Sequence, residues 1–506
     1  MSDLNVLDHL VIAAYAFAVL AIGLVTAHNR NSADDLLLGQ RSVPGWAALL
    51  SMVATELSAA TFIGVPVAAY LGAWTFLQFA FGSLLGKLVL GRWVIPLYHK
   101  QRVVTVYQFL ETALGPHTRR SAAMAFAGGR IMASGVRLFI AALAFSIVSE
   151  QSIPVTIVIC GVIAIAYTRV GGIRSVIWTD ALQGAVFVCA ALALLWAVTG
   201  GFGSVVDIFD WAKQHDKTTI FQLTPIVSLS SSVGFATAMI GGFFLTLATH
   251  ATDHDMVQRL LTTKDGRTGG RALIISGLLN FPLTLLFLFV GTGIAYHYSV
   301  APGYDITSTD QILPIFALHE LPAGARGLVF AGLLAAAMSS LDSAICAIAS
   351  TWVVDIAPGE NGPDDEAQLA ARLTRVSTRV GGLLIAAALV MSVYHARVSG
   401  DPSGPGLVEF ALSSMSILYG GLLGIFARGL LPAILGARES ETVSSARDRA
   451  ATAGLVVGSA IGLALFVHPA LAGRTLIAWT YWIPISATAS FVVASLAPRA
   501  FGGATR

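Results

Sequence analysis

The stretch AGLLAAAMSSLDSAICAIAS, residues 331–350, has one charged side chain, Asp342, among residues that are otherwise apolar, small or hydroxyl-bearing. About 20 mostly apolar residues cross the roughly 30 Å of bilayer hydrocarbon as a helix. The stretch therefore predicts the middle of a membrane-spanning helix.

The composition of the whole chain agrees with this stretch. Of the 506 residues, 56% are hydrophobic and only 11% are charged, whereas soluble proteins have roughly 25% charged residues. This balance excludes a soluble enzyme, and no nucleophile-base or metal-ligand pattern points to catalysis. The formal net charge of +2 gives no sign of a nucleic-acid partner.

Thirteen apolar segments separated by charged or Pro/Gly-rich breaks are long enough to span a membrane. Their limits are 8–27, 46–72, 74–98, 121–148, 153–172, 177–200, 232–250, 271–297, 324–354, 377–395, 408–427, 452–470 and 477–496. No connection is long enough for a domain of its own. We therefore expect residues 1–506 to form a single all-α transmembrane domain.

The basic residues predict the orientation, because Lys and Arg accumulate on the cytoplasmic side of membrane proteins. Placing the N-terminus outside puts 21 of the 30 Lys and Arg residues in cytoplasmic connections and five in outer ones. The C-terminus is then cytoplasmic.

Hydroxyl side chains form a stripe on segment 324–354. Ala336, Ser339, Ser340 and Ser343 have the spacing of one helix face, and Asp342 lies beside them. Hydroxyl, carboxylate and carbonyl oxygens suit a hard cation such as sodium. The alternative is close helix packing through small residues.

Segment 46–72 contains a polar run from Thr55 to Thr61, followed by Gly64 and Pro66. Transporters bind ions and substrates at broken helices near the membrane midplane. The run is a candidate for such a break, and a wet face of an unbroken helix is the alternative.

Few ionisable residues lie within the predicted spans, where they mark functional sites by default. Arg130 and Arg137 share one helix face and are expected either to hold an anionic substrate or to pair with Glu56 or Asp180. Two further basic residues, Lys87 and Arg92, are expected to extend to the headgroups. Aromatic and amide side chains suited either to a cavity wall or to packing are Trp74, Phe76, Gln78, Phe243 and Phe244.

Four motifs together resemble the sodium:solute symporter family: SAATFIG at 58–64, GGIRSVIWTDALQG at 171–184, DHDMVQR at 253–259 and AAMSSLDS at 336–343. The resemblance implies the leucine-transporter fold, an inverted repeat of five plus five helices. Residues 46–200 would form the first repeat and 232–427 the second, with 1–45 and 428–506 as peripheral helices.

The resemblance also implies sodium ligands. The shared site of the family would use Ala54, Leu57, Ala336, Ser339 and Ser340. A second site, found in bacterial sialic acid members, would use Asp180, Ser339, Asp342 and Ser343, although those members have serine at the position of Asp342. One or two Na⁺ ions and no organic cofactor are expected.

Substrate contacts are implied more loosely, because the arginine of the sialic acid branch aligns near Ala133, between Arg130 and Arg137. Glu56 replaces a neutral residue, which keeps amine-bearing, zwitterionic and polyhydroxylated solutes open. The predicted substrate-binding residues are Glu56, Ser58, Thr61, Phe76, Gln78, Arg130, Arg137 and Phe243.

The predicted function is sodium-coupled import of a small polar solute by alternating access. The solute would be a sialic-acid-like carboxylate or a sugar or polyol, carried by a monomer in a bacterial cytoplasmic membrane. A proton-coupled symporter and a solute sensor without transport are the alternatives.

Overall fold

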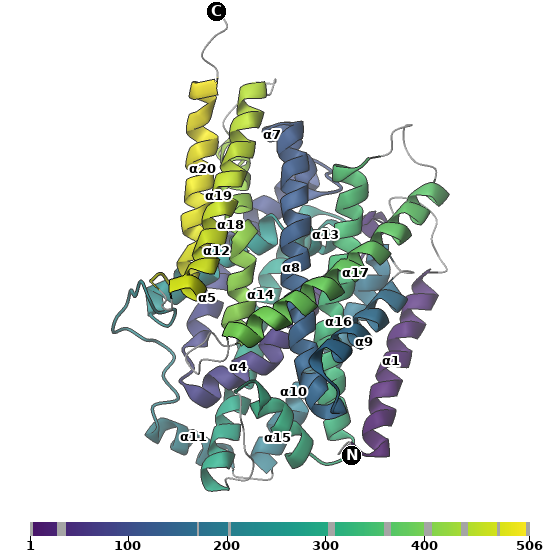
Figure 1. Ribbon diagram of the computed structural model, residues 1–506, viewed down its shortest axis with the longest axis vertical. Helices are drawn as coiled ribbons and strands as arrows, with labels where there is room; N and C mark the ends of the chain where they lie inside the picture. Colours follow the sequence, from purple (N-terminus) through teal and green to yellow (C-terminus); the bar gives the residue numbers. More distant parts are fainter. Residues whose placement is uncertain are drawn as a thin grey trace, which may run out of the picture.

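A computed structural model describes residues 4–27, 37–168, 172–200, 204–301, 309–358, 366–398, 407–436, 444–472 and 476–501. All regular structure in these ranges is helical (Figure 1), and the only β-type contact is an isolated bridge between Val43 and Thr263. The all-α prediction is confirmed.

The first half of the chain contains the helices α1 (Val6–Ala27), α3 (Gly45–Glu56), α4 (Ala59–Leu71), α5 (Phe76–Val89), α6 (Ile95–Lys100), α7 (Val106–Ala113), α8 (Pro116–Ser149), α9 (Ile153–Thr168), α10 (Gly172–Gly200) and α11 (Val205–Gln214). A π-helical turn, η2 (Leu90–Val94), joins α5 to α6, so that these three elements follow one another without a gap. A 3-10 turn, η1, covers Gly39–Arg41.

The second half contains α12 (Phe235–Ala251), α13 (His254–Leu261), α14 (Gly266–Val300), α15 (Ile312–Glu320), α16 (Ala325–Thr351), α17 (Glu366–Val398), α18 (Leu407–Ile434), α19 (Ser445–Ala472) and α20 (Trp482–Phe501). Its shorter turns are η3 (Thr309–Gln311), η4 (Trp352–Ile356) and η5 (Trp479–Tyr481).

Each of the thirteen predicted segments falls on one of these helices or on two consecutive ones. Nine stretches of the described residues are long and apolar enough to cross a membrane, and two bent helix pairs raise that number to eleven. The predicted segments 153–172 and 477–496 fall on α9 and on η5 with α20. The count of thirteen spans stays a prediction.

The two bent pairs occupy corresponding places in the predicted repeats. Helices α3 and α4 meet at 59°, and α12 and α13 meet at 63°. Each pair begins where a predicted repeat begins, at 46 and at 232. Broken helices in matching positions of two halves are a feature of secondary transporters.

Helix α16 lies at the centre of the molecule. In its most apolar window 94% of residues are buried, compared with 22% in α1, which lies at the edge of the bundle (Figure 1). Because α16 is buried on nearly all sides, its polar groups do not face lipid. The hydroxyl stripe of α16 must therefore meet other helices.

Candidate functional site

The first bent pair breaks at Leu57 and Ser58, which have non-helical backbone angles. In a continuous helix the Ser58 N–H would donate to the Ala54 carbonyl, but it donates to the Glu56 carbonyl instead. The break therefore frees the Ala54 carbonyl, as the polar run of the sequence predicts. Pro66 lies inside α4 and not at the break.

The freed carbonyl meets the hydroxyl stripe of α16. Ser339 Oγ donates to the Ala54 carbonyl at 3.2 Å and to the Ala336 carbonyl at 3.3 Å, and Ser340 Oγ donates to the Ala336 carbonyl at 3.3 Å. Both serines are fully buried. Four of the five predicted ligands of the shared sodium site thus lie together. Their oxygens are neutral, and this donor set fits a single hard monovalent cation.

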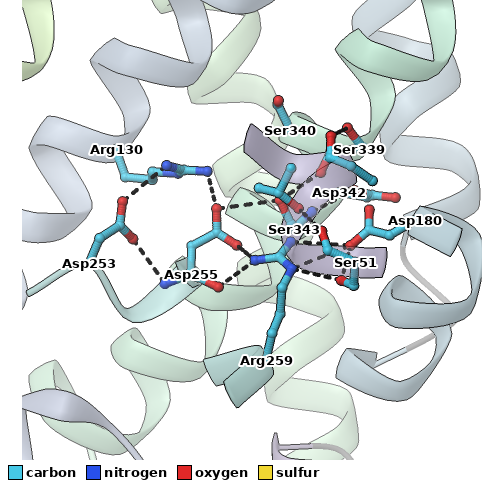
Figure 2. Close-up of polar contacts among 12 residues, drawn as sticks. Ser51, Arg130, Asp180, Asp253, Asp255, Arg259, Ser339, Ser340, Asp342 and Ser343 are labelled. Carbon is cyan, nitrogen blue, oxygen red and sulfur yellow. Dashed lines mark hydrogen bonds and ion pairs between the residues drawn. The ribbon is translucent and has the colours of Figure 1, made fainter. Parts of the chain in front are cut away.

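The residues predicted for a second sodium site lie further along α16 and on α10 (Figure 2). Ser343 Oγ donates to the Ser339 carbonyl at 2.7 Å, and the Ser343 N–H donates to Asp342 Oδ1 at 2.7 Å. Asp180 Oδ2 accepts from Ser51 Oγ at 2.5 Å, while Asp180 Oδ1 is buried and has no hydrogen-bond partner among the described residues.

A buried arginine of α13 stands among these acids. Arg259 Nη2 lies 3.3 Å from Asp180 Oδ2, and Arg259 Nη1 lies 2.6 Å from Asp255 Oδ1. Arg259 Nε donates to Ser51 Oγ at 2.9 Å. Arg259 is one of the 21 basic residues that the sequence assigns to cytoplasmic connections. The structure places it on a helix inside the protein, so that assignment is wrong for Arg259.

Arg130 pairs with the acids at the second helix break. Its guanidinium donates to Asp253 at 3.0 Å and to Asp255, and Tyr419 Oη donates to Asp253 at 2.5 Å (Figure 2 shows the arginine and both acids). We call Arg130, Asp253, Asp255 and Tyr419 the α13 network. The sequence-based reasoning offered Glu56 and Asp180 as partners of Arg130, and that pairing is wrong.

A cavity of about 160 Å³ opens beside the first break. Five of the predicted substrate residues line this central cavity, namely Glu56, Ser58, Thr61, Phe76 and Arg137. The other predicted contacts, Gln78, Arg130 and Phe243, lie elsewhere.

Two of these three residues have clear alternative surroundings. Gln78 donates to the carbonyls of Thr75 and Val233 and accepts from the Gln222 N–H, so its amide ties the segment before α12 to α5. Phe243 lines a separate, almost wholly apolar hollow with Leu85 and Trp93, which are exposed residues of α5 and η2.

The Glu56 carboxylate is fully engaged. Lys87 Nζ donates to Oε2 at 2.5 Å, and Asn280 Nδ2 donates to the same oxygen; His250 Nε2 and Ser276 Oγ lie 3.0 and 3.2 Å from Oε1. We call these five residues the Glu56 cluster. Lys87 is completely buried in it. The prediction that Lys87 extends to the headgroups is therefore wrong, because Glu56 supplies the charge that makes its burial tolerable.

Arg137 also lines the cavity, but its surroundings differ from those of Glu56. It is only 9% exposed, makes no ion pair with any described residue, and its Nη1 is buried without a hydrogen-bond partner in the described part of the chain. A buried cation without a partner is costly. Arg137 is therefore prepared to meet an anion that enters the cavity.

Sequence-based reasoning missed several residues that shape this site, among them Lys87, Asn280, Asp253, Asp255 and Tyr419. The available signal was the DHD sequence at 253–255, where two acids directly follow an apolar segment. Such a placement marks a break in a membrane helix as clearly as the run at Thr55 does.

The fold and the site define an integral membrane transporter of the broken-helix type, and comparison with known proteins agrees. The model of the sodium:solute symporter family matches residues 36–396. The sodium/sialic acid symporter of Aliivibrio fischeri is 31% identical over 83% of this chain and 83% of its own length. That of Proteus mirabilis is 27% identical over 85% and 86%.

Solved structures show the same fold. One, a Na⁺-coupled sialic acid symporter in a substrate-bound outward-open state, aligns with a TM-score of 0.83 at 24% identity and covers 98% of each chain. A nucleobase-cation-symport-1 family transporter in a closed conformation aligns at 0.54 with 14% identity over 92% of this chain and 94% of its own. The chain belongs to the sodium:solute symporter family, and it is a sodium-coupled transporter with the leucine-transporter fold.

Proposed function

We propose that the chain imports a small hydroxylated carboxylate, such as a sialic-acid-like sugar acid, together with Na⁺. The observation that carries this proposal is Arg137, a buried guanidinium without an ion-pair partner among the described residues, at the wall of the central cavity. A guanidinium binds a carboxylate through two parallel hydrogen bonds. The names of the two bacterial relatives support the same class of solute.

Glu56 does not oppose an anionic solute. The sequence left this question open, because an unpaired acid in the cavity would repel a carboxylate. In the structure, Lys87 balances the charge of Glu56. The carboxylate oxygens of Glu56 are further occupied by hydrogen bonds with Asn280, His250 and Ser276. Glu56 therefore offers no free carboxylate to an amine-bearing solute.

Sodium is proposed to bind to the Ala54 and Leu57 carbonyls together with Ala336, Ser339 and Ser340. This site joins α3, at the first break, to α16. An ion there would hold the break against α16 and thereby favour the substrate-binding arrangement of Ser58 and Thr61, and the solute would reciprocally tighten sodium binding. Asp180, Ser339, Asp342 and Ser343 are proposed to hold a second ion.

The protein is proposed to act as a monomer in a bacterial cytoplasmic membrane, with its N-terminus outside. The start of α1 and the end of α20 lie at opposite ends of the molecule (Figure 1), as an odd number of spans requires. One sodium ion moving inward at 100 mV contributes about 2.3 kcal/mol. That is enough for accumulation of the solute by some tens of times.

The test is uptake into proteoliposomes under an inward sodium gradient, with potassium as the replacement and at two pH values. The solutes are sialic acid, gluconate, galactose and a primary amine. We expect sodium-dependent uptake of a carboxylate, and we expect Arg137→Met to lower its kcat/KM by about 10- to 100-fold, because a hydrogen bond to a charged group contributes about 1.5–3 kcal/mol.

The matched control is Arg92→Met, which removes an arginine from the outer surface of η2 and should transport as the unmodified protein does. Uptake that follows protons and ignores sodium would contradict the proposal. So would a folded protein that carries only galactose or the amine.

A further inference from the structure

The Glu56 cluster fixes the orientation of one amide at the cavity wall. Asn280 and Ser276 lie one turn apart on α14, and both bond Glu56. Because a carboxylate accepts hydrogen bonds and never donates when it is ionised, the Asn280 group that faces it is the NH₂ and not the oxygen. Rotating the amide by half a turn would set two negative oxygens against each other.

The orientation leaves Asn280 Oδ1 pointing away from Glu56. This oxygen is buried, and it has no hydrogen-bond partner among the described residues. Asn280 nevertheless belongs to the lining of the central cavity. A buried amide oxygen without a donor costs about 1–3 kcal/mol, so a partner that arrives with the substrate would recover that free energy.

A second polar group of α14 stands beside it. Thr284 is four residues after Asn280, which places both on one face of the helix, and Thr284 also lines the cavity. Asn280 and Thr284 therefore form a polar wall supplied by α14, distinct from the wall of Ser58 and Thr61 at the helix break.

The two unsatisfied groups, Arg137 Nη1 and Asn280 Oδ1, come from different helices. Arg137 comes from α8 and Asn280 from α14, and α4 packs against both helices. The cavity thus presents an unpaired cationic donor from one helix and an unpaired neutral acceptor from another. A carboxylate alone satisfies the first group and leaves the second unsatisfied.

We propose that Asn280 selects substrates that carry a hydroxyl or amide N–H donor in addition to the carboxylate, by accepting a hydrogen bond from that donor at Oδ1. This inference rests on the proposed function, since it assigns the carboxylate to Arg137. Lys87 acts on the substrate only through Glu56, which holds the Asn280 amide in place, and it is a positioning residue.

Selection of this kind is strong because it works by exclusion. A site built to hydrogen-bond a donor rejects the analogue that lacks it, since the acceptor of the protein is then left without a partner. Removing the acceptor should therefore abolish the preference and leave the binding of the plain carboxylate nearly unchanged.

The experiment measures affinities of paired solutes by sodium-dependent thermal stabilisation of the purified full chain. Each pair shares its carboxylate and differs by one donor, as in lactate with propionate, and sialic acid with its monodeoxy analogues. In the unmodified protein we expect the donor-bearing member of at least one pair to bind tenfold or more tightly.

Two variants, Asn280→Leu and Asn280→Ala, should reduce that ratio to near one and change the affinity for the deoxy member by less than threefold. Leu keeps the volume of the side chain, and Ala is a strong helix former that guards against misfolding of the first variant. The matched control is Ser276→Ala, which also removes one donor from Glu56 but lies outside the cavity lining. It should keep the preference.

A preference that persists in both Asn280 variants overturns the inference, as does a ratio near one in the unmodified protein. Loss of the preference in Ser276→Ala to the same extent would also overturn it, because the Asn280 oxygen would then have no role of its own. Failure of the proposed function looks different: the unmodified protein would show no sodium-dependent binding of any carboxylate, and both proposals would fall.

Discussion

The charged residues show which features of the site can be predicted from the sequence and which cannot. The scarcity of charge in the spans singled out Glu56, Arg137, Asp180 and Asp342, and the structure buries or half-buries all four beside the two helix breaks and α16. Their partners could not be predicted, because Lys87 lies 31 residues from Glu56 and Asn280 lies 224 residues away. Only packing of the helices brings such residues together.

Asp342 carries a prediction at this scale. Asp342 Oδ1 accepts from the Ser343 N–H, so a cation near Ser343 would interact directly with Asp342. We expect Asp342→Ser to couple one sodium ion fewer per solute, because two carboxylates favour an additional cation that one paired carboxylate does not. Reversal potentials in proteoliposomes measure this ratio.

The control for that variant is Ser350→Ala, two turns further along α16, where Ser350 Oγ donates only within its own helix. It should leave the ratio unchanged. A ratio of one in the unmodified protein, equal in Asp342→Ser and independent of pH, would remove the second sodium site from the proposal.

The helices themselves were the best-predicted elements. Apolar length alone placed every predicted segment on a helix, because a bilayer admits few other spanning structures. The break between α12 and α13 was not predicted, since segment 232–250 contains no acidic residue and no proline, and the break lies just beyond it, at Thr252 and Asp253. The chain contains 50 glycines, and small residues favour close helix packing in membranes, but the sequence does not show which helices approach one another.

The structure identifies α5 and α12 as one such close pair. A Cβ placed on Gly242 would lie 2.2 Å from the Phe79 carbonyl oxygen, and one on Gly82 would lie 2.2 Å from that of Met239. Because the obstacle is backbone, neither helix relieves the overlap by a side-chain rotation. We expect Gly242→Ala to force the helices apart and to destabilise the protein by about 1–3 kcal/mol.

Thermal unfolding in detergent measures this effect as a lower Tm. The matched control is Gly382→Ala on α17, where a Cβ would meet nothing within 4 Å; it should unfold at or above the temperature of the unmodified protein, because Ala is the better helix former. Equal Tm values for Gly242→Ala and the unmodified protein would show that α5 and α12 separate without cost.

At the scale of the whole molecule, the site divides into layers along the membrane normal. Helix α8 starts at the end assigned to the cytoplasm by its basic connections and reaches Arg130 two turns before Arg137. In the proposed orientation, the α13 network therefore lies on the cytoplasmic side of the central cavity. It joins α8, α13 and α18 through fully buried groups, and a path from the cavity to the cytoplasm between these helices requires it to separate.

The mildest way to test this role is Tyr419→Phe, which removes one hydrogen bond to Asp253 and leaves both arginine pairs intact. A hydrogen bond to a charged group contributes about 1.5–3 kcal/mol, so the population of the inward-open state should rise by at least about tenfold. A cysteine introduced at Thr61 reports that population through its reaction with a membrane-impermeant thiol reagent applied to inside-out vesicles.

Tyr481→Phe is the matched control, because its hydroxyl lies 3.0 Å from Thr237 Oγ1 at the start of α12, the outer end in the proposed orientation. Labelling that rises in Tyr419→Phe but not in Tyr481→Phe identifies the α13 network as the inner gate, whereas equal labelling in both variants assigns the network to packing alone.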